Sequence, residues 1–173
     1  MPELKSVTSD FFFMRRQSED GVRQTIRDLC TTRLPQNMGI PADQIQVLTP
    51  TRKGPTGTIH LNRLLQEALN PPKTGKRQIQ WGERLFREGD RIMQTRNDYD
   101  VLWEKEDGTM GVGMFNGAVG RIAQIDHSGE RLSLEFDGRV ALYTAEMLGE
   151  IDLAYAQTAH KAQGSEHPCV ALC

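Results

Sequence analysis

The spacing of apolar residues changes near residue 70 and again near residue 151, which restricts the folds open to this chain. Residues 18–34 and 58–70 carry apolar side chains at helical spacing, and residues 44–49 alternate like a short strand. Pro35 is expected to end the first helix, and Phe11–Phe13 is a candidate for a further strand before it. The order strand, helix, strand, helix favours a parallel α/β layer with right-handed crossovers.

Between these two changes the chain consists of short apolar runs separated by glycine-containing turns. Ser128-Gly129 and Asp137-Gly138 are tight-turn dipeptides, because glycine accepts the positive φ that such turns need. The predicted strands are Gly89–Gln94, Met114–Asp126, Arg131–Phe136 and Arg139–Tyr143. This pattern predicts a small antiparallel barrel. From Ile151 the pattern returns to a strand followed by a helix, and Val170–Cys173 looks like a strand cut short.

Length and composition limit the class of protein. The 173 residues suit one domain with room for a small insertion, and a mean hydropathy of -0.52 with no long apolar run predicts a soluble, cytoplasmic protein without a membrane partner. The three cysteines show no disulfide framework, which fits a reducing compartment. Histidines and cysteines do not form two paired sets of zinc spacing, so no metal site is expected.

The net charge of -2 hides a separation of charge along the chain. Residues 52–96 contain ten basic and four acidic side chains, whereas residues 97–152 contain four basic and twelve acidic ones. A phosphate-bearing partner would suit the basic stretch. The alternative is a solvated basic face beside an acidic neighbour, and charge alone favours that alternative.

The densest group of polar side chains lies in the stretch from Leu153 to Pro168. Its hydrogen-bonding side chains are Thr158, His160, Lys161, Gln163, Ser165 and Glu166, and the flexible Gly164 lies among them. Such density favours a polar ligand at a junction between strand and helix, and the alternative is an exposed terminal turn with a glycine cap. No GxxxxGK[ST] loop occurs, so ATP hydrolysis by the isolated chain is not expected.

Four stretches together resemble one known family. They read VLTPTRKGPTGTIHLNRLLQEALNP at 47–71, FREGDRIMQTRNDYD at 86–100, FNGAVGRI at 115–122 and LAYAQTAHKAQGSEHP at 153–168. This set is similar to the RecD-like 5′-to-3′ DNA helicases of superfamily 1, which include the alpha subunit of exodeoxyribonuclease V. The last stretch resembles helicase motif V and the first resembles motif IV.

The resemblance implies the C-terminal half of an ATP-dependent helicase motor. Residues 1–109 and 149–173 would form a second RecA-like domain, truncated at its C-terminus, and residues 110–148 an inserted SH3-like barrel. The full-length parent would use ATP and Mg²⁺ in DNA repair and recombination, and none is expected bound to this fragment, which lacks the Walker motifs. Its partners would be single-stranded DNA, the absent first lobe and other exonuclease V subunits. The alternative is a stand-alone SH3- or KOW-like nucleic-acid-binding module, suggested by Asn116–Gly120.

The resemblance also implies roles for individual residues, although no catalytic set is complete in this chain. Thr158, His160 and Lys161 match positions that face the DNA backbone. Gln163, Gly164 and Glu166 match positions near the ATP cleft, and Arg52 and Lys53 match a loop that approaches the γ-phosphate. Tyr99 would stack on a base, and Asn97, Asn116 and Gly117 would brace the barrel or contact DNA. The family commonly has serine at Ala162 and an acid at Ala118. The first departure weakens the DNA role of the stretch at 153–168, and the second weakens the role of Asn116.

Overall fold

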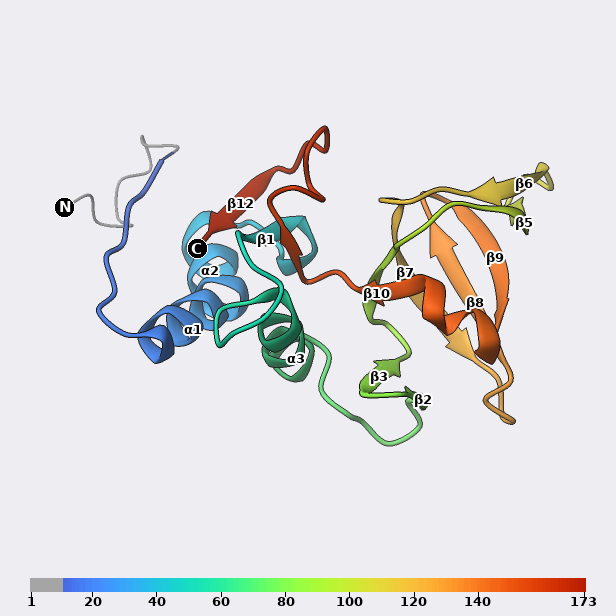
Figure 1. The fold of residues 1–173 in the computed structure, drawn as a ribbon, viewed down its shortest axis with the longest axis horizontal. Helices are drawn as coiled ribbons and strands as arrows, with labels where there is room; N and C mark the ends of the chain where they lie inside the picture. The colour runs from blue at the N-terminus through green and yellow to red at the C-terminus, as the bar shows by residue number, and fades with distance from the viewer. Residues whose placement is uncertain (1–10) are drawn as a thin grey trace. The chain divides into compact units, whose positions relative to one another are not determined.

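The computed structural model describes residues 11–173, and it divides into two compact units (Figure 1). Unit 1 comprises Met1–Leu69 and Ala156–Cys173, and unit 2 comprises Asn70–Tyr155. Residues 70–109 therefore belong with the antiparallel strands, whereas the sequence placed them with the α/β part. The reason is strand pairing, because the strands between residues 84 and 105 find their partners within unit 2.

Unit 1 contains a three-stranded parallel sheet. Its strands are β1 (Ile45–Thr49), β11 (Ala156–Thr158) and β12 (Cys169–Leu172), in the order β11-β1-β12. Val47 of β1 is aligned with Ala156 on one side and Ala171 on the other, and its side chain is fully buried. The expected strand at 44–49 and the parallel pairing are confirmed. Phe11–Phe13 forms no strand, and residues 11–16 have no regular structure.

The first helical segment is longer than its sequence suggested. Helix α1 (Glu19–Asp28) begins after Ser18, whose Oγ accepts the Gly21 N–H at 3.1 Å, and is followed by a π-helical turn (Leu29–Arg33) and helix α2 (Leu34–Met38). Pro35 was expected to end the helix, but the helical path runs through it. Proline cannot donate an i→i−4 bond, and the wider π turn just before it accommodates that loss. The helix ends at Gly39, whose φ of 66° suits glycine.

Helix α3 (Thr58–Leu69) matches the expected 58–70 helix and packs against β11 and α1. Leu61 and Leu65 are its fully buried apolar side chains, four residues apart on one face. From the same face, Asn62 donates from Nδ2 to the Ala156 carbonyl at 3.0 Å, and its Oδ1 accepts the Ala156 N–H at 2.8 Å. Both backbone groups of Ala156 are thus paired with one side chain where β11 begins.

Unit 2 is mainly an antiparallel sheet of seven strands in the order β10-β4-β7-β8-β9-β5-β6. The strands are β4 (Arg91–Gln94), β5 (Asp98–Lys105), β6 (Met110–Met114), β7 (Val119–Ile125), β8 (Arg131–Phe136), β9 (Arg139–Thr144) and β10 (Ile151–Leu153). The order starts at β10 and stops at β6, so no closed ring of strands forms within residues 11–173. A hairpin of β2 (Gln78–Trp81) and β3 (Arg84–Arg87) precedes the sheet, and 3₁₀ turns span Ala42–Gln44 and Ala145–Glu150.

The hairpin signals in the sequence are confirmed where glycine marks the turn. Asp137 and Gly138 have φ values of 50° and 72°, the pair of positive values that a tight two-residue turn between β8 and β9 requires. The alternating side chains Leu132, Leu134 and Phe136 of β8 are all fully buried. The helix expected before Gly164 is wrong, because β11 is followed only by turns.

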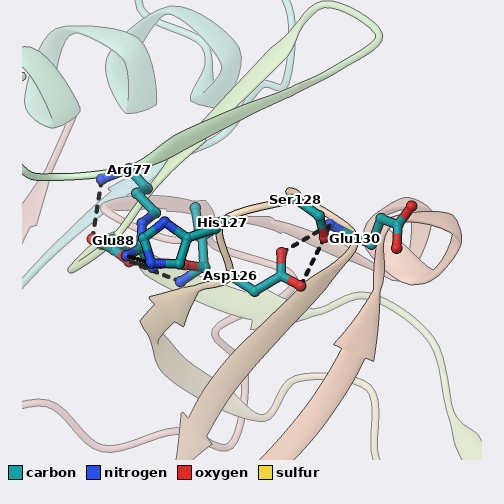
Figure 2. A network of polar contacts seen from close by, with 7 residues as sticks. Arg77, Glu88, Asp126, His127, Ser128 and Glu130 are labelled. Atoms are coloured by element: carbon teal, nitrogen blue, oxygen red, sulfur yellow. Dashed lines mark hydrogen bonds and ion pairs between the residues drawn. The ribbon is translucent and has the colours of Figure 1, made fainter.

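A network of polar contacts joins the β2–β3 hairpin to the start of the β7–β8 turn (Figure 2). Glu88 accepts the backbone N–H groups of Ile125 at 2.9 Å and Arg77 at 3.0 Å, and Arg77 in turn donates to the Ile125 carbonyl and contacts His127 at 3.1 Å. In the turn itself, Asp126 accepts from Ser128. Hydrogen bonds thereby fix the hairpin to the C-terminal end of β7.

Asp90 joins the two ends of unit 2. Its side chain is fully buried, and Oδ1 accepts from Asn70 Nδ2 at 2.7 Å and from the Tyr155 hydroxyl at 2.9 Å. Oδ2 accepts the Arg87 N–H at 2.6 Å. Asn70 and Tyr155 are the first and last residues of the unit. One buried carboxylate therefore holds both points at which the chain passes between the units.

Candidate nucleic-acid and nucleotide interface

The residues with predicted roles in unit 1 follow the carboxyl ends of two neighbouring strands. Strand β1 ends at Thr49 and β11 ends at Thr158, and these two residues are aligned in the parallel register. The loops at 50–57 and 159–168 therefore leave the sheet at the same edge. In open parallel sheets, ligands bind in the crevice beyond the carboxyl ends of the strands.

The loop after β1 is closed on itself by its own hydrogen bonds. Thr49 Oγ1 donates to the Thr56 carbonyl at 2.8 Å, and the N–H groups of Thr58 and Ile59 donate to the carbonyls of Thr51 and Arg52 at 3.1 and 3.2 Å. The first N–H groups of α3 are thus used within the loop and form no phosphate cradle of the P-loop type. The loop can offer a phosphate its side chains, because Arg52 and Lys53 are exposed.

Gly57 is required by the tightness of this loop. A Cβ at this position would lie 2.5 Å from the Lys53 carbonyl oxygen and 2.6 Å from that of Arg52, both of which are backbone atoms. Any side chain at Gly57 would therefore displace the two cationic residues that the sequence singled out.

The segment after β11 is a series of turns attached to the end of β1. The Ala159 N–H donates to the Thr49 carbonyl at 3.1 Å, and the Lys161 N–H donates to the Thr158 carbonyl at 2.9 Å, with Thr158 Oγ1 3.3 Å away. The next residue, Ala162, is buried, so its methyl group packs inward where serine would place a hydroxyl. The departure from the family pattern at this position thus lies away from the exposed face.

The exposed polar side chains of this segment are His160, Lys161, Gln163, Ser165 and Glu166, and Gly164 has a φ of 86°. Arg52, Lys53 and Thr158 lie at the same edge of the sheet as these residues, because β1 and β11 end there side by side. The resemblance assigned them to two motifs and did not say where the motifs lie in the fold. Four of these residues, Arg52, Lys53, His160 and Lys161, are cations or an imidazole, and Glu166 is a carboxylate. Such a mixture suits phosphate oxygens on one side and a hydroxyl donor on the other.

Tyr99 and Asn116 belong to unit 2 and are not part of this edge. There the Asn116 N–H donates to Asn97 Oδ1 at 2.9 Å, and Asn97 Nδ2 donates to the Tyr99 hydroxyl at 3.1 Å. Tyr99 also forms an edge-to-face pair with Phe115, with ring centroids 6.0 Å apart. The two rings are 65% and 51% exposed, which leaves aromatic surface open to a base.

Phe115 was missed by the sequence reasoning, although it directly precedes the Asn116-Gly117 pair that was noted. Its signal was an aromatic residue beside a glycine turn, which is also common in cores. Only the pairing of β5 with β6, which aligns Asp98 with Met114, brings it to Tyr99.

Comparisons with known proteins find relatives among DNA helicases. Residues 61–136 match the family model of the SH3 domain of ATP-dependent RecD-like DNA helicases. The resemblance to RecD-like helicases is confirmed. The ATP-dependent RecD2 DNA helicase of Deinococcus radiodurans is 43% identical over 122 residues, which are 70% of this chain and 15% of that helicase. The chain therefore spans about one seventh of the length of this RecD-like relative.

A solved structure of unliganded Pif1 from Bacteroides sp covers 74% of this chain and 45% of its own, at 14% identity and a TM-score of 0.41. That score is too low to establish a shared fold.

No helix within residues 11–173 is long and apolar enough to cross a membrane.

Proposed function

We propose that this chain is part of the motor of a RecD-like ATP-dependent DNA helicase, contributing contacts to single-stranded DNA and part of the ATP site. The observation that carries the proposal is the register of Thr49 with Thr158, which places the motif IV-like and motif V-like loops at one edge of a parallel sheet. The family match over residues 61–136 supports it. In this proposal unit 1 is the second RecA-like domain and unit 2 its SH3-like insertion.

The residues at this edge divide into two roles. Thr158, His160 and Lys161 contact the backbone of the single strand, where hydroxyl, imidazole and ammonium groups donate to phosphate oxygens. Arg52, Lys53, Gln163, Gly164 and Glu166 face the nucleotide, where the cations stabilise charge on the γ-phosphate during its transfer. The acid that binds Mg²⁺ and the Walker A lysine would belong to the first lobe. The isolated chain should therefore not hydrolyse ATP.

The salt dependence of DNA binding tests the division of roles. We expect weak binding of a labelled single-stranded oligonucleotide, with a log-log salt slope of about 0.7 for each neutralised phosphate. Lys161→Ala should reduce the slope by roughly one contact, whereas Glu166→Ala, a matched exposed residue of the same segment, should leave it unchanged. Fluorescence anisotropy across a salt series measures both. Equal slopes for wild type and Lys161→Ala would remove Lys161 from the DNA path.

A second candidate function belongs to unit 2 alone, as a nucleic-acid-binding module of the SH3 or KOW type. It is favoured by the exposed Tyr99–Phe115 pair beside the Asn97 and Asn116 amides. Stacking of a base on such a ring contributes about 1–3 kcal/mol and carries no charge. Phe115→Ala should therefore weaken oligonucleotide binding without changing the salt slope. If instead both Tyr99→Ala and Phe115→Ala bind as wild type does, the Tyr99–Phe115 pair has no stacking role.

A further inference from the structure

The outer face of strands β9, β5 and β6 carries a row of exposed apolar side chains. Leu102 of β5 is aligned with Val112 of β6, and Glu104 is aligned with both Met110 of β6 and Val140 of β9. The exposed members are Leu102, Met110, Val112, Val140 and Leu142, with exposed fractions between 44% and 68%. Scattered surface leucines are ordinary, but these five side chains lie on three paired strands and share one face, which the carboxylate of Glu104 interrupts between Met110 and Val140.

The opposite face of the same strands is used by the core. Trp103 of β5 is aligned with Ala141, which is fully buried, and with Gly111. The Trp103 ring lies against Gly111 so closely that a Cβ there would be 2.1 Å from a ring carbon. Strand alternation therefore fixes Leu102 and its neighbours on the outside, so the exposed row cannot turn inward without a shift of register.

A groove of about 800 Å³ runs over this face. Its apolar lining includes Leu102, Met110 and Leu142, and its charged lining residues are Asp98, Asp100 and Glu104, all acidic. The groove lies in the stretch of sequence with twelve acidic and four basic side chains. An apolar groove lined by three acids repels nucleic-acid phosphates and, equally, the like-charged face of a second copy.

We propose that this groove, the β5–β6 groove, binds a protein segment that carries apolar side chains flanked by Lys or Arg. Burial of the exposed row supplies affinity, and the three acids select the partner by its positive charge. This proposal does not depend on the proposed DNA contacts of the loops at 50–57 and 159–168 in unit 1, because the β5–β6 groove lies in unit 2.

The test uses the full chain and a capped synthetic peptide in which leucine and valine alternate with lysine through glycine spacers. Amide NMR shifts of the labelled protein should move on titration at residues 98–104, 110–112 and 140–147 and saturate. The same peptide with glutamate in place of lysine should cause no saturable shift, and neither should one with serine in place of leucine and valine. Saturable binding of either control peptide would overturn the proposal.

Single substitutions locate the site. Leu102→Ser should weaken binding of the lysine peptide about tenfold, the size of effect expected at the centre of an interface, and Asp100→Lys should weaken it and reduce its salt dependence. The matched controls are Ile59→Ser, an exposed apolar residue of α3, and Glu130→Lys, an exposed acid outside the groove lining. The NMR spectra also show whether each variant is folded.

Three other occupants are outcomes that refute the proposal. Shifts at the same residues on adding an oligonucleotide, or on adding phosphatidylglycerol vesicles without the peptide, would assign the groove to phosphate groups or to a lipid surface. Sedimentation that shows a dimer lost in Leu102→Ser would assign it to a second copy of the chain.

Discussion

Asp90 is a carboxylate with no exposed surface, and its neighbours explain how it is tolerated. Its carboxylate accepts hydrogen bonds from Asn70, Tyr155 and the Arg87 backbone. Burial raises the pKa of the Tyr155 hydroxyl, and the Asp90 charge beside it raises that pKa further, so this tyrosine remains a donor at neutral pH. A buried charge of this kind is stable only while its donors are present.

Removal of the Asp90 carboxylate should therefore be costly. Asp90→Ala leaves the donors from Asn70, Tyr155 and Arg87 buried without their acceptor, and we expect the free energy of unfolding to fall by about 3 kcal/mol. Denaturant unfolding followed by circular dichroism measures it. Glu106→Ala, at an exposed acid in the β5–β6 turn, is the control and should change stability little. A loss below about 1 kcal/mol for Asp90→Ala would contradict the proposed network.

Glu88 predicts a loss of stability in acid. Burial acts to raise its pKa, but N–H donation from Ile125 and Arg77 and the Arg77 charge outweigh burial, so the pKa lies below its ordinary value of 4.5. Because the folded pKa is the lower one, the stabilisation is complete above about pH 4.5 and is lost as the pH falls through the folded pKa. Glu88→Gln should be less stable at pH 7 and should approach wild type in acid. Parallel stability curves from pH 2 to 7 would contradict this role.

At the scale of elements, the sequence predicted segments whose own periodicity decides their structure. Helix α3 and strand β8 show their apolar faces within a single run of residues. Strand β5 was missed because its side chains do not alternate between apolar and polar. Val101 is buried, but the neighbouring Leu102 is apolar and exposed, and Asp98 and Asp100 are of a residue type common in turns. Its place depends on partners at β6 and β9, which no local pattern contains.

The helix expected after β11 failed for a related reason. The Ala159 N–H bonds to the Thr49 carbonyl of another strand, and Gly164 adopts a φ of 86°. The resemblance assigned the candidate site to two motifs, and the structure shows that both motifs follow strands aligned at one edge of a sheet. The roles of the individual residues stay predictions.

Gly120 gives a sharp prediction for the sheet. A Cβ there would lie 2.2 Å from the Glu135 carbonyl oxygen and 2.6 Å from a Phe136 ring carbon. Gly120→Ala should therefore separate β7 from β8 and destabilise the chain by about 2 kcal/mol. Gly21→Ala in α1, whose nearest neighbour is the Ser18 hydroxyl at 3.1 Å, is the matched control and should be neutral or stabilising. Thermal unfolding distinguishes the two, and equal melting temperatures would refute the steric argument.

At the scale of the whole molecule, unit 2 has its own core, and its first and last residues are held together from within the unit. Its largest fully buried side chains include Phe86, Phe136 and Tyr143, and Asp90 holds its two ends from within. We expect a fragment of residues 70–155 to fold alone. Its amide NMR spectrum should overlay that of the full chain at β4 to β10, and a collapsed spectrum with narrow dispersion would contradict this expectation. A fragment with Asp90→Ala provides the comparison.

The bond between Asn62 and Ala156 joins residues 94 positions apart, with the whole of unit 2 between them. Closing so long a loop costs entropy and slows folding when the intervening chain is disordered. If unit 2 forms first, Asp90 brings Asn70 beside Tyr155, and the remaining loop between Asn62 and Ala156 becomes short. In that case the folding of unit 2 brings β11 close to β1, with which it pairs. Folding then proceeds from the middle of the chain outward.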